Sequence, residues 1–148
     1  MAIIVQKAGV EQIDALVPLF DAYRQFYRRP SAPDDARVFL LERMERQQSV
    51  VFLAFDGAVA VGFVQMFPSF SSAAMRSILI LNDLFVAHSA RGTGVGRALL
   101  DVAASYGRQV GAARLTLSTE NTNTSAQAIY EHMGWTPSTD FQHYNVAL

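Results

Sequence analysis

One stretch of the sequence, Arg91-Gly92-Thr93-Gly94-Val95-Gly96, restricts the folds open to this chain more than any other. An apolar run over 77–87 precedes it and helix-like apolar spacing over 94–109 follows it, so it joins a predicted strand to a predicted helix. Glycine at three alternate positions lets several backbone N–H groups converge on one point. The helix N-terminus adds partial positive charge, and such a turn is typical of a phosphate or pyrophosphate site.

Two common phosphate-binding patterns do not fit this turn. The P-loop ends in glycine, lysine and serine or threonine, whereas Gly96 is followed by Arg97 and Ala98. The dinucleotide pattern G-x-G-x-x-G fits at Gly92 and Gly94 but fails at its third position, Arg97. A nucleotide-binding α/β module that uses the turn for another phosphate stays open, as does a turn whose glycines serve only the backbone.

Apolar spacing elsewhere predicts strands that alternate with helices. The expected strands are 3–5, 50–55, 58–67, 77–87 and 115–118, with two short strands within 135–148. The expected helices are 11–28, a second one ending near residue 47, 94–109 and 123–133. Asp34 or Asp35 is expected to cap the second helix, and Asp56-Gly57 predicts a hairpin. Residues 68–75 are expected to form a loop.

The resulting order, β-α-α-β-β-β-α-β-α-β-β, places hairpins first and βαβ units later. This order predicts an α/β fold of the α+β mixed-sheet kind, with helices on both faces of the sheet. The 148 residues show no repeat, low-complexity tract or linker, so we expect a single domain over 1–148.

Composition excludes several kinds of chemistry. The sequence has no cysteine, which excludes disulfides, thiolate metal sites and a cysteine nucleophile. The scattered histidines lack metal-ligand spacing, so no metal is expected; they are His88, His132 and His143. A net charge of -1 argues against nucleic acid, and the absence of a long apolar run or leader pattern predicts no membrane span and a cytoplasmic location. Lys7 is the only lysine, so catalysis through lysine is nearly excluded.

Two motifs resemble a known family. Leu84-Phe85-Val86, followed by Arg91, Gly94, Gly96 and Ala98-Leu99-Leu100, is similar to the acetyl-CoA-binding motif of the GNAT superfamily of N-acetyltransferases, R/Q-x-x-G-x-G/A. A second GNAT motif is matched, at the expected distance, by Asn123, Ala126, Ile129, Tyr130, Glu131, Gly134 and Trp135. The chain most resembles small microbial members that acetylate amines or histones.

The resemblance implies where acetyl-CoA binds. The backbone of the glycine turn would hold the CoA pyrophosphate, and the main chain of the preceding strand would pair with the pantetheine arm. Residues expected to contact the donor are Phe85, Val86, Arg91, Gly92, Thr93, Gly94, Val95, Gly96, Arg97, Asn123 and Tyr130. Tyr130 would lie near the sulfur, and a phenol with a pKa near 10 can give the departing thiolate a proton, so Tyr130 is the expected general acid.

The acceptor amine must lose a proton, since a primary ammonium has a pKa near 10.4. Asn82 and Asp83 precede the turn, where polyamine-acetylating members commonly have two acids. Asp83 is expected to act through a water or to bind a cationic amine, with a purely structural hydrogen bond as the alternative. Strand alternation places the two side chains on opposite faces unless a bulge intervenes.

Other expected acceptor contacts lie on the first helix and on the predicted loop. Tyr23 and Tyr27 resemble an aromatic motif of the microbial members and suit a cation, although core packing explains them as well. Ser69 and Phe70 would line the acceptor cleft from the loop, and His143 and Tyr144 are weaker candidates.

These residues lead us to expect the GNAT acyl-CoA N-acyltransferase fold and direct acetyl transfer from acetyl-CoA to a small primary amine, such as a polyamine or amino acid. Direct transfer follows because no cysteine is present to carry the acetyl group. A protein lysine or N-terminus as the acceptor, and a non-catalytic acetyl-CoA-binding sensor, are the alternatives. Related proteins are commonly homodimers, and the two C-terminal strands would pair across chains.

Overall fold

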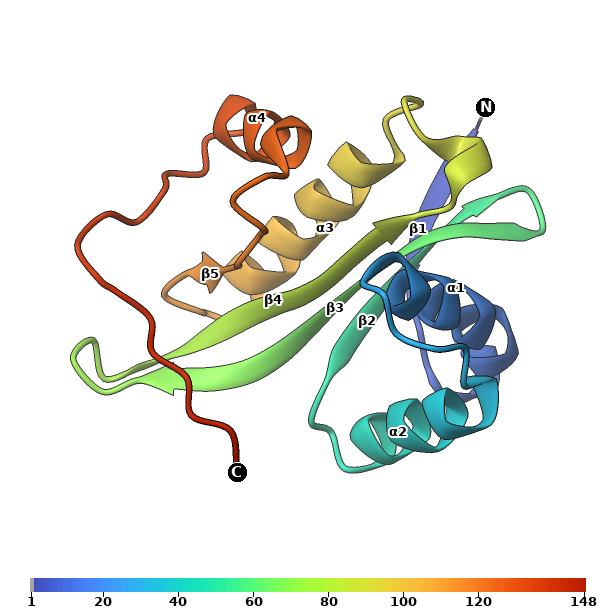
Figure 1. Ribbon diagram of the computed structural model, residues 1–148, viewed down its shortest axis with the longest axis horizontal. Coiled ribbons are helices and arrows are strands. Elements are labelled where there is room, and N and C mark those ends of the chain that lie inside the picture. The colour runs from blue at the N-terminus through green and yellow to red at the C-terminus, as the bar shows by residue number, and fades with distance from the viewer. Residues whose placement is uncertain (1) are drawn as a thin grey trace. The chain divides into compact units, whose positions relative to one another are not determined.

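Apolar strands in the first part of the chain form one five-stranded sheet in the order β1-β2-β3-β4-β5 (Figure 1). The strands are β1 (Ile3–Lys7), β2 (Val50–Asp56), β3 (Val59–Ser71), β4 (Arg76–Val86) and β5 (Leu115–Thr116). Strands β1 to β4 are antiparallel and β5 is parallel to β4, so the predicted mixed sheet is confirmed. This structure is a computed structural model, and it describes residues 2–148.

The helices agree with the predicted ones in number and order. They are α1 (Ile13–Phe26), α2 (Pro33–Glu45), α3 (Val95–Gln109) and α4 (Thr124–His132), with short 3-10 turns η1 (Val10–Gln12) and η2 (His88–Ala90). Contacts within residues 1–117 form one compact unit and contacts within residues 118–148 form another. We call these the N-terminal unit and the C-terminal unit. The single domain over 1–148 stays a prediction.

Within the N-terminal unit, helices cover both faces of the sheet, as predicted. Phe63 of β3 faces α1, where its ring centroid lies 6.0 Å from that of Phe20. Phe52 of β2 faces α3, where its ring centroid lies 5.6 Å from that of Tyr106. The Lys7 ammonium lies 5.3 Å from the Tyr106 ring centroid, on the same side.

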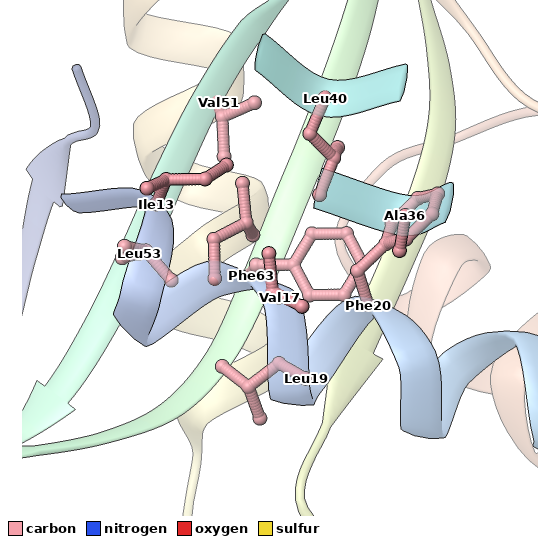
Figure 2. Packing of buried hydrophobic residues seen from close by; sticks show 10 residues of the cluster. Ile13, Val17, Leu19, Phe20, Ala36, Leu40, Val51, Leu53 and Phe63 are labelled. Carbon is pink, nitrogen blue, oxygen red and sulfur yellow. The ribbon is translucent and has the colours of Figure 1, made fainter. Parts of the chain in front are cut away.

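The main core lies between the sheet and the pair α1 and α2 (Figure 2). Period-3.6 apolar residues of α1 meet alternating apolar residues of β2 and β3, because each element presents one apolar face. The fully buried side chains there include Leu16, Leu40, Leu53 and Phe63. Full burial of one such side chain stabilises the fold by about 1.5–3 kcal/mol relative to exposure.

Asp21 ties the end of α1 to the start of α2. Its carboxylate accepts hydrogen bonds from Ser31 Oγ at 2.7 Å, Ala32 N at 2.8 Å and Gln25 Nε2 at 3.1 Å. The bond from Ser31 is the main cause, and that from Ala32 the next, of a lowered pKa for Asp21, which outweighs the opposing effect of burial.

The prediction that Asp34 or Asp35 caps α2 is wrong. The helix has Ala32 as its N-cap and begins at Pro33, and the two aspartates lie in its first turn. Proline is favoured at the first helical position because the N–H that it lacks would have no helical partner. Carboxylates in the first turn interact favourably with the helix dipole.

The loop predicted at 68–75 is also wrong, because β3 continues to Ser71 and β4 begins at Arg76. Only residues 72–75 form the turn, in which Met75 has a φ of 52°. Proline and serine suggested a loop by composition. The neighbouring strand overrides them, since Pro68 pairs with Leu79 and Ser69 with Ile78.

In the C-terminal unit, α4 ends as predicted, with Gly134 at a φ of 94° just beyond the C-cap. The two strands predicted within 135–148 are wrong, since this described segment contains neither helix nor strand. A strand requires a neighbour for its N–H and C=O groups, and the five-stranded sheet ends at β5. The expected homodimer therefore lacks its predicted pairing element and stays a prediction. No helix in the described part of the chain is both long and apolar enough to cross a membrane.

Candidate active site

The glycine-rich turn adopts a backbone conformation that only glycine accepts without strain. Gly92 has a φ of 76° and Gly94 a φ of 89°, and Gly94 is the N-cap of α3. A Cβ on either residue would meet no atom within 4 Å, so conformation rather than crowding requires glycine. The first N–H groups of a helix have no partner inside it, and the first turn of α3 has no acidic residue. The turn therefore suits an anion.

Arg91 fastens this turn to the end of β4. Its Nε donates to Val86 O at 3.1 Å, and the Thr93 hydroxyl donates to Ala90 O. The Arg91 guanidinium lies 5.6 Å from the ring centroid of Phe85 and 5.6 Å from that of Phe26 on α1, within cation–π range of both. Together with the exposed Arg97 it makes the turn locally positive.

Gly62 on β3 positions this turn, and our sequence reasoning missed it. A Cβ there would lie 3.0 Å from Phe85 O, 3.1 Å from Val95 Cγ1 and 3.2 Å from Leu99 Cδ1. The absence of a side chain therefore lets the first turns of α3 lie close against the sheet. A glycine inside a predicted strand often marks such a close approach, and that signal was present in the sequence.

The edge of β4 that leads to the turn is open within the N-terminal unit. Strand β5 pairs with β4 only at Leu79 and Ile80, whereas β4 continues to Val86. Among the residues that the structure describes, no strand pairs with β4 on this side beyond Ile80. An extended ligand with amide groups can add to such an edge as a further strand.

A β-bulge brings Asn82 and Asp83 together. Gln65 pairs with Asp83 and the next residue of β3, Met66, pairs with Leu81, so Asn82 is the extra residue. Asn82 Nδ2 donates to Asp83 Oδ1 at 3.1 Å, and Gln65 Nε2 donates to Asp83 Oδ2 at 2.7 Å. Asp83 is only 4% exposed, whereas Asn82 is exposed. Strand alternation alone would place these two side chains on opposite faces of the sheet. The bulge, which we allowed as an exception, is present.

Aromatic side chains of α1 lie beside this bulge. Tyr23 packs its ring against Tyr27, at 5.1 Å between centroids, and against Phe85, at 6.1 Å. The Tyr23 hydroxyl donates to Asn82 O at 3.4 Å. The structure therefore places Tyr23 and Tyr27, two predicted acceptor contacts, with Asn82 and Phe85 on the face that α1 covers.

Ser69 and Phe70, the other predicted acceptor contacts, lie elsewhere. They pair with Ile78 and Ser77 near the far end of the β3–β4 hairpin, where Phe70 is 82% exposed. Ile78 precedes Asp83 by five residues, which is about 16 Å along a strand. The structure thus does not bring these two residues to the bulge, and their role in binding the acceptor stays a prediction.

The two predicted site residues of the C-terminal unit both belong to the α4 region. Asn123 is the N-cap of α4, and its Oδ1 accepts a hydrogen bond from Ala126 N at 3.3 Å. Tyr130 is half-buried, with its ring centroid 6.0 Å from that of Trp135. Capping occupies the Asn123 oxygen, so a contact with the donor would use its amide N–H groups. His143 and Tyr144 lie in the exposed segment that follows.

Comparison with known proteins decides the family. The sequence profile of the Acetyltransferase (GNAT) family matches residues 16–135. The chain belongs to the GNAT acetyltransferase family. It is 43% identical to an uncharacterized N-acetyltransferase, YhfO, of Bacillus subtilis, over 95% of this chain and 94% of the relative. It also resembles the crystal structure of a probable acetyltransferase, with a TM-score of 0.91, 38% identity, and coverage of 100% of this chain and 98% of the other.

A third comparison concerns the fold alone. The structure of AAC(6')-Iy in complex with a bisubstrate analog, CoA-S-monomethyl-acetylneamine, is 20% identical, with a TM-score of 0.81 and full coverage of both chains. This GNAT chain is an acyl-transferring enzyme, and the family generally uses acetyl-CoA as the acetyl donor. The turn with its left-handed glycines and the open edge of β4 fit the pyrophosphate and the amide-bearing arm of that donor. No group of three or more metal-ligating side chains is found among the described residues.

Proposed function

We propose that this acetyltransferase transfers the acetyl group of acetyl-CoA directly to the primary amine of a small cationic molecule, such as a polyamine or an amino acid. The observation that carries the proposal is the buried carboxylate of Asp83, which lies on the open part of β4 two residues before Phe85. One strand thus supplies a proton acceptor and leads directly into the turn expected to bind the donor.

The donor half of the proposal rests on the glycine turn and the edge of β4. The turn N–H groups would hold the pyrophosphate, and Arg91 and Arg97 would neutralise part of its charge. The main chain of Phe85 and Val86 would pair with the pantetheine arm. A backbone N–H of the strand segment 84–86 would polarise the thioester carbonyl, as the donors of an oxyanion hole do.

The chemical step needs one proton acceptor and one proton donor. The neutral amine attacks the thioester carbonyl carbon, a C–N bond forms, the C–S bond breaks and CoA leaves as a thiolate. Asp83 would take a proton from the ammonium form of the acceptor before this attack, Tyr130 would give a proton to the thiolate, and the proton that the nitrogen loses as the amide forms would replace the proton of Tyr130. The role of Tyr130 rests on the second sequence motif. Because the chain has no cysteine, the acetyl group passes directly between the two substrates.

The acceptor class follows from charge and aromaticity near the bulge. A buried carboxylate attracts an ammonium group, and the faces of Tyr23 and Tyr27 suit a cation. A protein lysine or N-terminus has the same amine chemistry and is the second candidate. A sensor that binds acetyl-CoA without turnover is the third, favoured by Asn82 where related polyamine enzymes commonly have an acid.

Thiol release from acetyl-CoA over a panel of amines tests the proposal. The panel should contain polyamines, amino acids, a lysine-containing peptide and a peptide with a free N-terminus. We expect turnover with at least one small amine and a large loss of kcat in Asp83→Asn. Turnover with peptides alone would favour the second candidate. Absence of turnover with every amine, in a protein that still binds acetyl-CoA, would favour the sensor.

A further inference from the structure

Within residues 2–148, Gln65 is the one buried polar side chain seen to contact Asp83 from another strand. It lies on β3 directly opposite Asp83, is 1% exposed, and donates from Nε2 to Asp83 Oδ2 at 2.7 Å. Its Oε1 is also buried and has no hydrogen-bond partner among the described residues. Buried polar atoms nearly always have partners, so an unpartnered amide oxygen next to a carboxylate calls for a functional reason.

The surroundings of Asp83 contain few other groups that titrate or carry charge. Asp83 lies on the face that α1 covers, because it alternates in step with Phe85, whose ring contacts Tyr23. From α1, the Tyr23 hydroxyl reaches the bulge at Asn82 O and Tyr27 packs behind the Tyr23 ring, and Arg91 stacks on Phe85 further along. The paired residues of β5 do not titrate, and α3 packs on the opposite face. Gln65 is therefore the neutral group best placed to respond to the charge of Asp83.

We propose that Gln65 is a positioning residue that serves Asp83 both before and after proton transfer. This inference rests on the proposed function, in which Asp83 takes the proton of the acceptor amine. Before transfer, the Nε2–H group of Gln65 donates to the ionised carboxylate, as observed. During transfer an N–H bond of the substrate ammonium breaks, its electron pair stays on nitrogen, and an O–H bond forms on Asp83.

After transfer, rotation of the Gln65 amide by half a turn presents Oε1 to the new O–H group. The observed separation of 2.7 Å between Gln65 Nε2 and Asp83 Oδ2 also suits an O–H···O bond between these positions. A primary amide can donate to a carboxylate and accept from a carboxylic acid without moving its backbone. An apolar side chain of the same size can do neither, and this explains a glutamine at a fully buried strand position.

The pH profiles of two variants test the inference. Gln65→Met keeps the volume and removes the amide that donates to the ionised carboxylate, so the acid limb of kcat/KM should move to higher pH. We also expect kcat to fall about 10–100-fold, as for the loss of one hydrogen bond to a charged group, with KM for acetyl-CoA unchanged. Gln65→Glu donates only while the introduced carboxyl is protonated, so its activity relative to wild type should fall as pH rises.

Asn82→Ala is the matched control, because it removes the other amide from the same carboxylate at an exposed position that water can fill. A much smaller shift of the acid limb is expected there. Unchanged pH profiles in both Gln65 variants would overturn the inference. So would equal losses in kcat and in thermal stability with no shift of the acid limb, since that result describes a purely structural glutamine.

A measurement on the unaltered protein does not depend on any variant folding. The side-chain amide signals of Gln65 in ¹⁵N NMR spectra should change with pH and show the midpoint of the acid limb of kcat/KM. Signals that stay constant through that limb would also overturn the inference. If no amine is turned over, the proposed function fails separately, and the NMR titration still reports whether Gln65 follows the protonation of Asp83.

Discussion

Gly94 carries both a conformational and a functional requirement. Its φ of 89° is one that a residue with a Cβ adopts at a cost of about 1–2 kcal/mol. Gly94→Ala should lower the free energy of unfolding by that amount. It should also raise KM for acetyl-CoA, because relief of the strain would turn N–H groups of the turn away from the pyrophosphate. Chemical denaturation and initial-rate kinetics measure the two effects.

Gly111→Ala separates strain from binding. Gly111 has a φ of 76° and open space where a Cβ would lie, as Gly94 has, but it lies beyond the other end of α3. The control should therefore lose similar stability and keep its KM for acetyl-CoA. Equal KM values for the two variants would argue against the turn as the donor site.

Tyr130 carries the proposed general-acid role through a single oxygen atom. Tyr130→Phe keeps the ring beside Trp135 and removes the hydroxyl, so kcat for thiol release should fall about 100-fold, within the range typical of general acid catalysis. Tyr106→Phe is the matched control, because the Tyr106 ring packs on Phe52 in the N-terminal unit. Full activity in Tyr130→Phe would remove this residue from the mechanism.

At the scale of elements, substitutions near the two ends of α3 test how its close packing against the sheet affects donor binding. Gly62→Ala places a Cβ about as close as 3.0 Å to the Phe85 carbonyl oxygen, so the first turn of α3 or the end of β4 must shift. We expect lower stability and a higher KM for acetyl-CoA, measured by thermal melting and kinetics.

Gly107→Ala gives the comparison for this prediction. A Cβ at Gly107 would lie 2.5 Å from Leu115 Cδ1, so it also crowds α3, but near the opposite end from the turn. This variant should lose stability and keep the KM for acetyl-CoA. If both variants change the KM for acetyl-CoA to the same extent, then any crowding of α3 alters the turn. The close contact between Gly62 and the first turns of α3 would then have no special role.

The junction between α1 and α2 predicts a pH dependence of stability. Hydrogen bonds lower the pKa of Asp21 in the folded state, so its contribution is complete above the unfolded value of about 3.9 and is lost as pH falls through the lower folded value. Asp21→Asn should destabilise the protein by about 1–3 kcal/mol near neutral pH. The gap between wild type and variant should narrow below about pH 4. Urea unfolding at several pH values measures it, with Asp101→Asn, an exposed carboxylate on α3, as the control.

At the scale of the whole molecule, a ligand that binds only the folded chain stabilises it by an amount that grows with the logarithm of the ligand concentration divided by Kd. Acetyl-CoA at 100 times its Kd should raise the free energy of unfolding by about 2.7 kcal/mol. Thermal melting with acetyl-CoA, CoA, ATP and NAD should show stabilisation by the two CoA compounds. Stabilisation by ATP or NAD alone would point instead to the nucleotide-binding alternative.

The features that the sequence predicted correctly are those that depend on a few neighbouring residues. Left-handed glycines at 57, 94 and 134 mark a hairpin, a helix start and a helix end because only glycine adopts those conformations at little cost. The helices and the mixed sheet followed from local apolar spacing. The two family motifs are likewise short stretches whose residue types can be read directly.

The features that the sequence did not predict depend on which residues face each other across strands. Gln65 meets Asp83 only because a bulge at Asn82 sets the register between β3 and β4. Residues 68–71 are a strand because β4 lies beside them, and 135–148 is not one despite its suitable pattern. Pairing partners are not written in a single segment, so composition alone led us to expect Ser69 and Phe70 in a loop and not in β3.

The position of Lys7 makes the chain convenient to modify chemically. It is the only lysine of the sequence, and its ammonium lies over Tyr106, eleven residues along α3 from Val95, or about 16 Å from the turn. Apart from the terminal amine, an amine-reactive dye or surface tether therefore attaches at one place, away from the proposed pyrophosphate site. Any acetyl-lysine found in the purified protein must likewise come from this one side chain.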